Sequence, residues 1–536
     1  MASIGRATAL LASGTLVSRV LGFGRQWLLL QAIGGTGLIA DAFATANQAP
    51  NTIYAIISQG VLNAVLIPQL VRAAKHRDGG QAYVNKLVTL GMVVFAFLTT
   101  AATLLSPQLM SLLGVHNPRV FDIAVAFALW SMPQVFFYGL YSLLGEVLNA
   151  RNSFGPFTWA PVLNNIISIA SLALFLVLYG PLPVRTVGDW PTLKIFILAG
   201  GSTIGIVAQA VVLFAFWRRV GLRFRFDFRW RGMELRTVGK AAGWTFAMLL
   251  CSQLAGIYQT RIANSASGPH QAGPQGITTT WLIFMLPYSI IAVSVVTAYF
   301  TRMSEHARDQ DFGAFRRDYS AAVRQIVLLI SISAAVLIVT AFSFSRVFTL
   351  DYVPYGFVLI GFLIGLVPSV VGFVSLRALY SLGDTRSPFV YTLIQSLLVV
   401  IGLTVCLSLP VDIRAVGIAV TVSIAGTVQT VLSMVFLRRR LHGLELRAVG
   451  QSIAQGFVAA AVATVLGYLT LFGVDHLGGH AGFATASKLT AIVAMIIVGV
   501  VMLAAYVLVL RAFRTPELMD AWGRLRRRVG RSQRAE

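Results

Sequence analysis

The sequence contains few of the residues from which catalytic and metal sites are built. It has 19 Asp and Glu against 42 Lys and Arg, with two cysteines and seven histidines among 536 residues. Cys251 and Cys406 lie in separate apolar stretches, and the histidines fall in loops or at the ends of apolar runs without metal-ligand spacing. Motifs of hydrolases, zinc proteases and P-loop NTPases are also missing. We therefore expect neither an enzyme nor a resident cofactor.

Charge of either sign is scarce, because apolar residues make up 57% of the chain and charged residues only 11%. This composition is typical of a polytopic helical membrane protein and excludes a soluble domain. Apolar runs bounded by Gly, Pro and charged residues predict about fourteen transmembrane helices. The predicted spans are 7–33, 41–70, 86–113, 120–147, 156–180, 191–217, 238–263, 274–301, 321–345, 353–378, 388–409, 414–437, 450–474 and 486–513.

The basic residues concentrate in alternate loops between these spans. Positive charge on short loops marks the cytoplasmic side of a membrane protein. The alternation predicts a multi-pass plasma-membrane protein with both termini in the cytoplasm, and it explains most of the net charge of +23 without nucleic acid as a partner. The largest clusters lie at 72–86, 218–240, 302–324 and 438–447, and in the tail from 511.

Two halves of the chain carry similar residues in the same order. Gln209 precedes Arg218-Arg219 at the end of the sixth span, and Gln429 precedes Arg438-Arg439 at the same distance at the end of the twelfth. Six spans separate the copies, and an even number gives both copies the same topology. The pattern predicts an all-α fold of two pseudo-symmetric six-helix lobes with a cavity between them.

The repeat also predicts how the chain is divided. Residues 1–220 would form an N-lobe and residues 221–440 a C-lobe. Residues 441–513 hold two further spans, which either bind a lipid tail or serve as scaffold. Residues 514–536 combine arginines with spaced apolar residues, which predicts a basic amphipathic helix on the inner leaflet.

The stretch Ser18–Arg25 is the most informative one in the chain. Arg19 lies about 18 Å into the first span, near the middle of a bilayer core of about 30 Å. A guanidinium at that depth costs at least a few kcal/mol unless it faces water or protein. Gly22 and Gly24 weaken the helix between Arg19 and Arg25. Both arginines either face a wet cavity or bond to carbonyl groups of neighbouring helices, and Arg25 could instead reach the outer interface.

Uncharged polar residues interrupt several other spans. Hydrogen bonding between helices is one explanation for such residues. The alternative is that they line a polar, cationic interior, whose natural guest is an anion, with phosphate favoured because arginine pairs with two of its oxygens. The candidates to line this interior are Tyr54, Asn63, Asn164, Asn165 and Gln253.

Several motifs follow one another along the chain in a characteristic order. They are Ser18-Arg19-Val20-Leu21-Gly22-Phe23-x-Arg25, Ala40-Asp41-Ala42-Phe43, Pro50-Asn51, Leu148-Asn149-Ala150-Arg151, Ala160-Pro161-Val162-Leu163-Asn164-Asn165 and Leu382-Gly383-Asp384-Thr385-Arg386-Ser387-Pro388. With these motifs the chain resembles the MurJ/MviN family of lipid II flippases in the MOP exporter superfamily, in the form found in actinobacteria. The resemblance implies alternating access through a central cationic cavity, with a lipid-linked peptidoglycan precursor moving from the inner to the outer leaflet.

The resemblance also implies substrate-binding roles for Arg19, Arg25, Asp41 and Asn51. Two positions depart from the family pattern. Tyr54 stands where well-studied members carry an arginine, and the arginine that they carry just before the proline of the eighth span is replaced in residues 281–286, which precede Pro287. Arg261 is the candidate that could replace the missing positive charge in binding pyrophosphate.

Other functions remain open at this point. A MATE-like small-molecule antiporter or a polysaccharide-lipid flippase could use a related fold, and a scaffold for cell-wall synthases would need no transport. A membrane-bound transferase would need acidic metal ligands, which are scarce. We expect a lipid-linked anionic substrate, membrane lipids and cell-wall synthesis proteins as partners. A monovalent cation or the membrane potential would supply the energy, since no ATP-binding motif is present.

Overall fold

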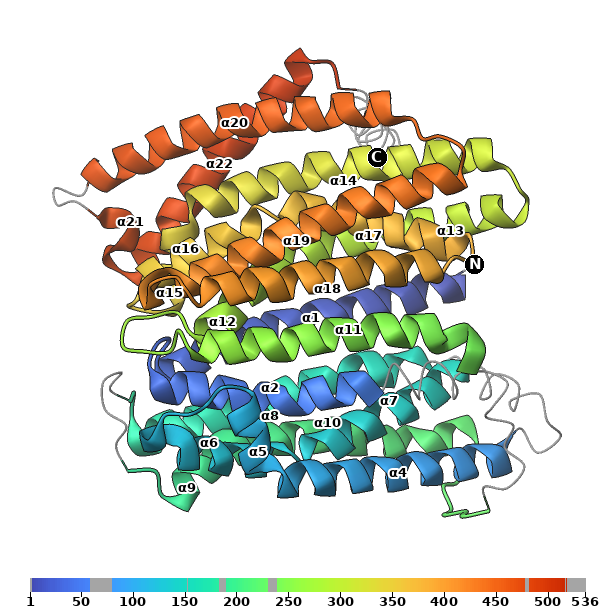
Figure 1. Ribbon diagram of the computed structural model, residues 1–536, viewed down its shortest axis with the longest axis vertical. Helices are drawn as coiled ribbons and strands as arrows, with labels where there is room; N and C mark the ends of the chain where they lie inside the picture. The colour runs from blue at the N-terminus through green and yellow to red at the C-terminus, as the bar shows by residue number, and fades with distance from the viewer. Residues whose placement is uncertain are drawn as a thin grey trace, which may run out of the picture. The chain divides into compact units, whose positions relative to one another are not determined.

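The computed structural model describes residues 2–57, 80–151, 153–182, 189–229, 239–477, 482–515 and 517, and all regular elements in these ranges are helical. The chain forms two compact units, Met1–Gly276 and Ile277–Glu536. Within each unit the long helices run side by side in similar directions (Figure 1). The all-α fold class predicted from the sequence is therefore confirmed.

The first unit is built from long helices and several short ones. They are α1 (Ala2–Ile33), α2 (Leu38–Ile57), α4 (Gln81–Leu104), α5 (Ser106–Leu112), α6 (Pro118–Ser131), α7 (Gln134–Ala150), α8 (Phe154–Tyr179), α9 (Thr192–Ile195), α10 (Gly201–Trp217) and α11 (Gly239–Asn264). A π-helical turn, Phe196–Gly200, joins α9 to α10.

Helix α8 lies at the centre of the packing in the first unit, against α1 on one side and α10 on the other. Two glycines of α10, Gly201 and Gly205, make the second contact close. A side chain at Gly201 would collide with Ser171, and one at Gly205 would collide with Asn164. Small residues one turn apart let two helix backbones approach, which is how membrane helices gain packing energy without a hydrophobic driving force.

The second unit begins within α12 (Pro274–Pro287). A π-helical turn, Tyr288–Ala292, follows Pro287, as expected where proline removes a backbone donor from a helix. The remaining helices are α13 (Val293–Arg308), α14 (Phe312–Val339), α15 (Ala341–Phe348), α16 (Tyr352–Leu363), α17 (Leu366–Ser381), α18 (Arg386–Cys406), α19 (Val411–Arg440), α20 (Leu446–Leu477), α21 (Phe483–Ala486) and α22 (Lys488–Ala512).

Helix α19 has the central place in the second unit and packs against α16, α17 and α18. Glycine again permits the approach, because a side chain at Gly365 would collide with Ser423. The last two long helices, α20 and α22, pack on each other and on α14. Tyr506 of α22 donates a hydrogen bond to the Leu328 carbonyl of α14 at 2.7 Å, so these helices are joined by a buried polar contact as well.

Among the described residues, ten helical segments are long and apolar enough to cross a membrane, and the bent pair α16–α17, with its 41° bend, would make eleven. Each of the fourteen predicted spans has helical residues within its range, but the number fourteen stays a prediction. Asn63, in the second predicted span, lies outside the described residues.

The compact units divide after Gly276, further along the chain than the predicted lobe boundary at residue 220. Helix α11 lies between these two positions and packs on α2 of the first unit. Of the predicted tail 514–536, only residues 514, 515 and 517 belong to the described part of the chain. The tail helix therefore stays a prediction.

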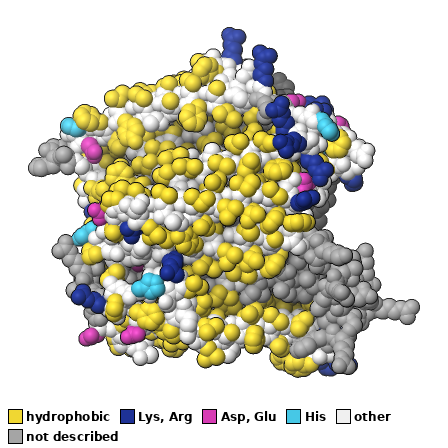
Figure 2. All heavy atoms as spheres, in the orientation of Figure 1, with side chains coloured by type: hydrophobic (Ala, Val, Ile, Leu, Met, Phe, Trp, Pro, Cys, Tyr) yellow, Lys and Arg dark blue, Asp and Glu magenta, His cyan; other side chains and the backbone are white. Residues whose placement is uncertain are grey.

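Arginines of the second unit gather at one end of its helices. They lie where α13, α17, α19 and α22 end and where α14, α18 and α20 begin. Figure 2 shows dark blue side chains toward one end of a broad apolar face over these helices. An apolar face with basic residues at one end is the surface expected of a membrane-spanning bundle. The arginines are Arg302, Arg308, Arg316, Arg317, Arg377, Arg386, Arg438, Arg439, Arg440, Arg447 and Arg511.

Candidate functional site

Arg19 lies midway along α1 on an exposed face of that helix. Its side chain is exposed, together with those of Leu16 and Val20, and it has no hydrogen-bond or ion-pair partner among the described residues. The preceding residue is held in place, because Asn165 of α8 donates a hydrogen bond from Nδ2 to the Ser18 carbonyl at 2.8 Å. Helix α8 therefore fixes the backbone of α1 and leaves the guanidinium of Arg19 available to a ligand.

Arg25 lies less than two turns further along α1 and has a different environment. It is half-buried beside Tyr138 of α7, close enough for electrostatic interaction with the tyrosine hydroxyl. The ring of Tyr138 packs on that of Tyr54 from α2, with centroids 5.5 Å apart and ring planes tilted by 30°. Arg25, Tyr138 and Tyr54 thus form a row. At its end Tyr54 supplies a neutral hydroxyl, whereas an arginine at this position would add a positive charge.

Asp41 is 1% exposed and lies in the first turn of α2, where the helix dipole stabilises a carboxylate. Its Oδ1 accepts a hydrogen bond from the backbone amide of Gln275 at 2.9 Å. Gly273 packs directly on the carboxylate, so any side chain there would collide with it. The structure therefore places Asp41 against the connection between α11 and α12, apart from the surroundings of Arg19 and Arg25.

Two further contacts join α2 to α11. Asn264, at the end of α11, donates from Nδ2 to Thr45 Oγ1 at 3.0 Å. Gln253 donates from Nε2 to the Thr52 carbonyl at 3.3 Å. Gln253, a candidate for the cavity lining, is thus placed between two helices, while Asn51 on the same α2 is exposed. Of the α2 residues predicted for the site, Asn51 is exposed, Tyr54 is half-buried and Asp41 is buried.

The two asparagines of α8 are buried and bonded within the first unit. Asn164 donates from Nδ2 to Gln209 Oε1 of α10 at 2.9 Å, and Asn165 bonds to Ser18 as described above. An amide in an apolar helix interface needs such a partner, because an unsatisfied one costs about 1–3 kcal/mol. In this structure both side chains join helices, and Asn165 does so next to Arg19.

Arg261 lies near the end of α11, on the surface of the first unit. It borders a shallow hollow of about 550 Å³ together with Gln108, Ser111 and His116. Gly114, in a left-handed conformation with φ of 90°, lies so close to the Arg261 backbone that a side chain there would collide with it. The residues around Arg261 differ from those around Arg25, so the two arginines occupy separate places on the unit.

The structure adds a buried polar group that the sequence did not single out. Gln134, at the start of α7, donates from Nε2 to Thr203 Oγ1 at 3.0 Å and to Asn47 Oδ1 at 3.2 Å. This group links α7 to α10 and α2, one turn before Tyr138. The signal in the sequence was the Pro133-Gln134 pair inside an apolar run, which marks the break between α6 and α7.

The chemistry of the exposed and half-buried residues is that of an anion-binding site. Arginine offers only hydrogen-bond donors, and a tyrosine hydroxyl or an asparagine amide adds further donors. Guanidinium binds phosphate and carboxylate through two parallel hydrogen bonds. Arg19, Arg25, Tyr138 and Asn51 could therefore hold an anionic group during binding and release, without a covalent step.

Comparisons with known proteins agree on one family. The model of the family described as "Lipid II flippase MurJ" matches residues 30–487. The chain is 24% identical over 450 residues to a "Probable lipid II flippase MurJ" of Rhizobium meliloti (strain 1021), covering 81% of this chain and 80% of the relative. It is 25% identical over 522 residues to a protein of the same description from Rhizobium tropici, covering 92% of each.

Solved structures with similar folds come from the same family and a neighbouring one. A structure described as "Lipid II flippase MurJ, inward closed conformation" aligns with a TM-score of 0.72 and 18% identity, covering 94% of this chain and 99% of that one. An inward-facing MATE multidrug transporter of the MOP superfamily aligns with a TM-score of 0.63 and 15% identity, covering 81% and 98%. These two structures establish the fold.

Proposed function

The chain belongs to the MurJ family of lipid II flippases, and from this premise we propose that it moves lipid II from the inner to the outer leaflet of the bacterial plasma membrane. It is a multi-pass membrane transporter whose partners include a lipid-linked substrate and membrane lipids. Its transport is by alternating access, in which the binding residues open to one side of the membrane and then to the other.

The exposed guanidinium of Arg19 is the observation that carries this proposal. Helix packing does not need the side chain, because the neighbouring contact with α8 is made by Ser18 and Asn165. A charged group midway along a membrane helix is costly unless it faces water or a ligand. The pyrophosphate of lipid II provides oxygens that a guanidinium can bind in pairs. Arg19 is therefore the residue to which we assign the first contact with the substrate.

The other arginines would bind the pyrophosphate in turn. Arg25, supported by Tyr138 and Tyr54, follows Arg19 along α1, and Arg261 on α11 would bind it last. Asn51 would add a neutral contact from α2. Asp41 would act by holding the α11–α12 connection in place, since its carboxylate is buried against Gln275 and Gly273.

The predicted orientation in the membrane is consistent with the membrane potential as the energy source. The basic ends of the helices, with both termini, would face the cytoplasm. An inside-negative membrane potential then drives the anionic headgroup outward, at about 2.3 kcal/mol per charge for each 100 mV. The positive charge of the empty arginines would favour the return step.

Depletion of this protein in cells that have no other lipid II flippase tests the function directly. Lipid II should accumulate and stay inaccessible to a lipid II-cleaving enzyme added outside the cells, and the cells should swell and lyse. Expression of the wild-type chain should restore outside accessibility. Unchanged accessibility after complete depletion would contradict the proposal.

A further inference from the structure

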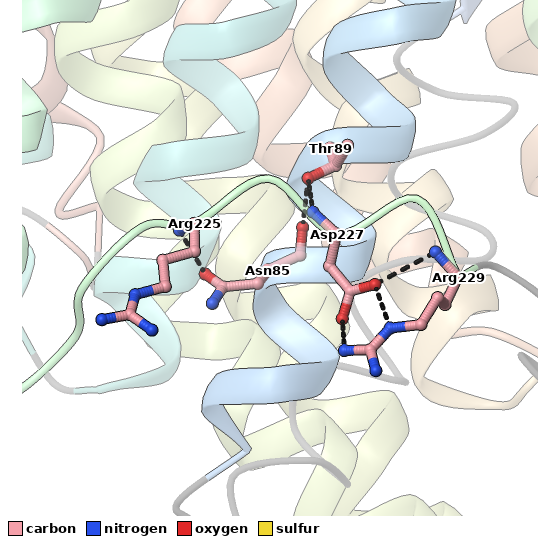
Figure 3. Close-up of polar contacts among 5 residues, drawn as sticks. All are labelled: Asn85, Thr89, Arg225, Asp227 and Arg229. Carbon is pink, nitrogen blue, oxygen red and sulfur yellow. Dashed lines mark hydrogen bonds and ion pairs between the residues drawn. The ribbon is translucent and has the colours of Figure 1, made fainter.

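A short extended segment outside the candidate site has an unusual composition. It follows α10 and the 3-10 turn Arg218–Val220, after which Gly221 adopts a left-handed conformation with φ of 78° that ends the helix. Residues 222–229, called the arm here, then run alongside α4 (Figure 3). Charged and aromatic residues alternate in the arm, as Arg223-Phe224-Arg225-Phe226-Asp227-Phe228-Arg229.

The arm is fixed to α4 by polar residues spaced four apart on the helix. They bond to backbone groups spaced two apart on the arm. Four residues of helix rise about 6 Å and two residues of extended chain about 6.6 Å, so the two spacings stay in register. The bonds are Gln81 Nε2 to the Arg223 carbonyl at 3.3 Å, the Arg225 amide to Asn85 Oδ1 at 3.4 Å and the Asp227 amide to Thr89 Oγ1 at 3.0 Å.

The phenylalanines of the arm form an aromatic row. Phe224 is anchored by Trp217 of α10, with ring centroids 6.1 Å apart. Phe226 and Phe228 continue the row, with stacked rings 6.2 Å apart. These two side chains are 63% and 62% exposed. Two adjacent exposed aromatic rings are unfavourable in water but suit the headgroup region of a membrane.

The charged side chains of the arm are unequally paired. Arg229 donates hydrogen bonds to the Asp227 carboxylate from its backbone amide, Nε and Nη2, and holds the pKa of that carboxyl at about 2. Figure 3 shows the Arg225 guanidinium pointing away from Asn85 and Asp227. Arg223 and Arg225 have no acidic partner among the described residues. Two guanidinium groups are thus left to bind an anion.

The position of the arm on α4 points to the kind of anion. The row of residues that holds the arm continues along α4 with Val93 and Phe97, which are 41% and 72% exposed. The helix therefore changes, within about two turns of Thr89, from a polar face covered by the arm to an exposed apolar face. Such a change in a membrane helix marks the boundary between headgroups and acyl chains.

We propose that the arm is a binding site for anionic phospholipid. Arg223 and Arg225 bind the headgroup phosphate, and Phe226 and Phe228 enter the region between headgroups and acyl chains. Arg225 of the arm and Asn85 of α4 border a shallow hollow of about 690 Å³, in which the headgroup is held. The paired Asp227 and Arg229 also line this hollow, whereas Arg223 lies outside its lining and adds positive charge from two residues earlier in the arm. An acidic protein segment would satisfy the arginines but not the exposed aromatic pair beside an apolar helix face. This site is independent of the proposed function, because it is assayed without lipid II.

Native mass spectrometry of the full chain from nanodiscs of phosphatidylcholine and phosphatidylglycerol tests the proposal. Arg225→Glu should weaken phosphatidylglycerol binding by about 30-fold, because it changes the charge by two units and each basic residue near an anionic surface is worth roughly fivefold. Arg317→Glu, which makes the same charge change at an exposed position on α14, should weaken binding much less than Arg225→Glu. Equal losses in the two variants would overturn the proposal.

Two further variants separate the arm from general electrostatics. Asn85→Leu removes a contact that holds the arm without changing its charge, and it should weaken phosphatidylglycerol binding several-fold. The double change Phe226→Ser and Phe228→Ser should weaken binding to phosphatidylglycerol but not to a soluble acidic peptide. Unchanged lipid retention in either variant would overturn the site, and equal binding of the peptide and the lipid by the wild-type chain would make the arm a protein-docking surface.

Discussion

The two compact units share a glutamine hydrogen bond between neighbouring helices, but they differ in the charged groups that lie midway along their helices. In the first unit, Gln209 of α10 accepts a hydrogen bond from Asn164 of α8 at 2.9 Å. In the second unit, Gln429 of α19 donates to Thr392 of α18 at 3.1 Å. Each glutamine thus joins the last predicted span of its sequence repeat to the span before it, the sixth to the fifth and the twelfth to the eleventh. The comparison shows that this polar contact serves packing in both units.

The two units differ in the polar and charged groups that lie midway along their helices. Several described polar groups midway along the helices of the second unit are hydroxyls that bond to nearby carbonyls, such as Ser423 to Gly361 at 2.7 Å and Thr430 to Pro368 at 2.8 Å. A cavity of about 320 Å³ in that unit has a neutral lining that includes Tyr288. The first unit instead carries Arg19 and Arg25 midway along α1. The second unit also has an arginine midway along a helix, Arg324 of α14, but Arg324 is paired with Glu517 at 2.6 Å. Because Arg19 has no such acidic partner among the described residues, binding is the explanation that we favour for it.

The largest effect should come from the charge that packing does not explain. Arg19→Ala should reduce lipid II flipping by about two to three orders of magnitude, since losing one partner of a desolvated ion pair costs roughly 2–5 kcal/mol. Arg19→Lys should recover part of the activity, because ammonium keeps the charge but loses the planar fork. Flipping would be measured by outside accessibility of lipid II at matched protein level.

The control for Arg19 is Val20→Ala, which changes the next exposed position of α1 without touching charge. It should flip at the wild-type rate. Normal flipping by Arg19→Ala would mean that the arginine has a structural role, and the contrast between the two units would lose its functional meaning.

A smaller effect is expected for the other two arginines. Arg25→Ala and Arg261→Ala should each slow flipping by about tenfold, because each removes one charged hydrogen-bonding group worth roughly 1.5 kcal/mol or more. Their surroundings share no residue, so the double variant should show the sum of the two free-energy changes within about 0.5 kcal/mol. A double-mutant cycle on the flipping rate measures this. A clear departure from additivity would show that both arginines bind one pyrophosphate at the same moment.

The smallest effect is expected from removing the glutamine hydrogen bond that both units contain. Gln209→Leu and Gln429→Leu should each lower the stability of the protein in detergent by about 1–2 kcal/mol, because each leaves a buried partner unpaired. Thermal unfolding of the purified full-length variants measures the change, and flipping per folded molecule should stay normal in both. A selective loss of flipping in Gln209→Leu would place that glutamine among the binding residues. The two glutamines would then have different roles.

Much of the fold could be predicted from the sequence because membrane helices are local features. An apolar run of sufficient length must be helical, since a bilayer leaves no other way to satisfy its backbone groups. The position of Arg19 midway along a helix could be predicted in the same way, because it depends only on the local apolar run. Its role in binding stays a prediction, based on the cost of a charge at that depth. The glutamines that close each half could be found as a repeat, although their partners could not.

Pairings between distant segments were decided only by the tertiary structure. Asn165 could have lined a cavity, but packing of α8 on α1 gave it the Ser18 carbonyl. No sequence pattern indicated a role for Tyr138, which the fold of α7 brings near Arg25. Asp41 is bound to Gln275, more than two hundred residues away, because the α11–α12 connection lies over the start of α2. Hydropathy and spacing determine that a residue is helical and how deep it lies, whereas its partner depends on which helix faces pack together.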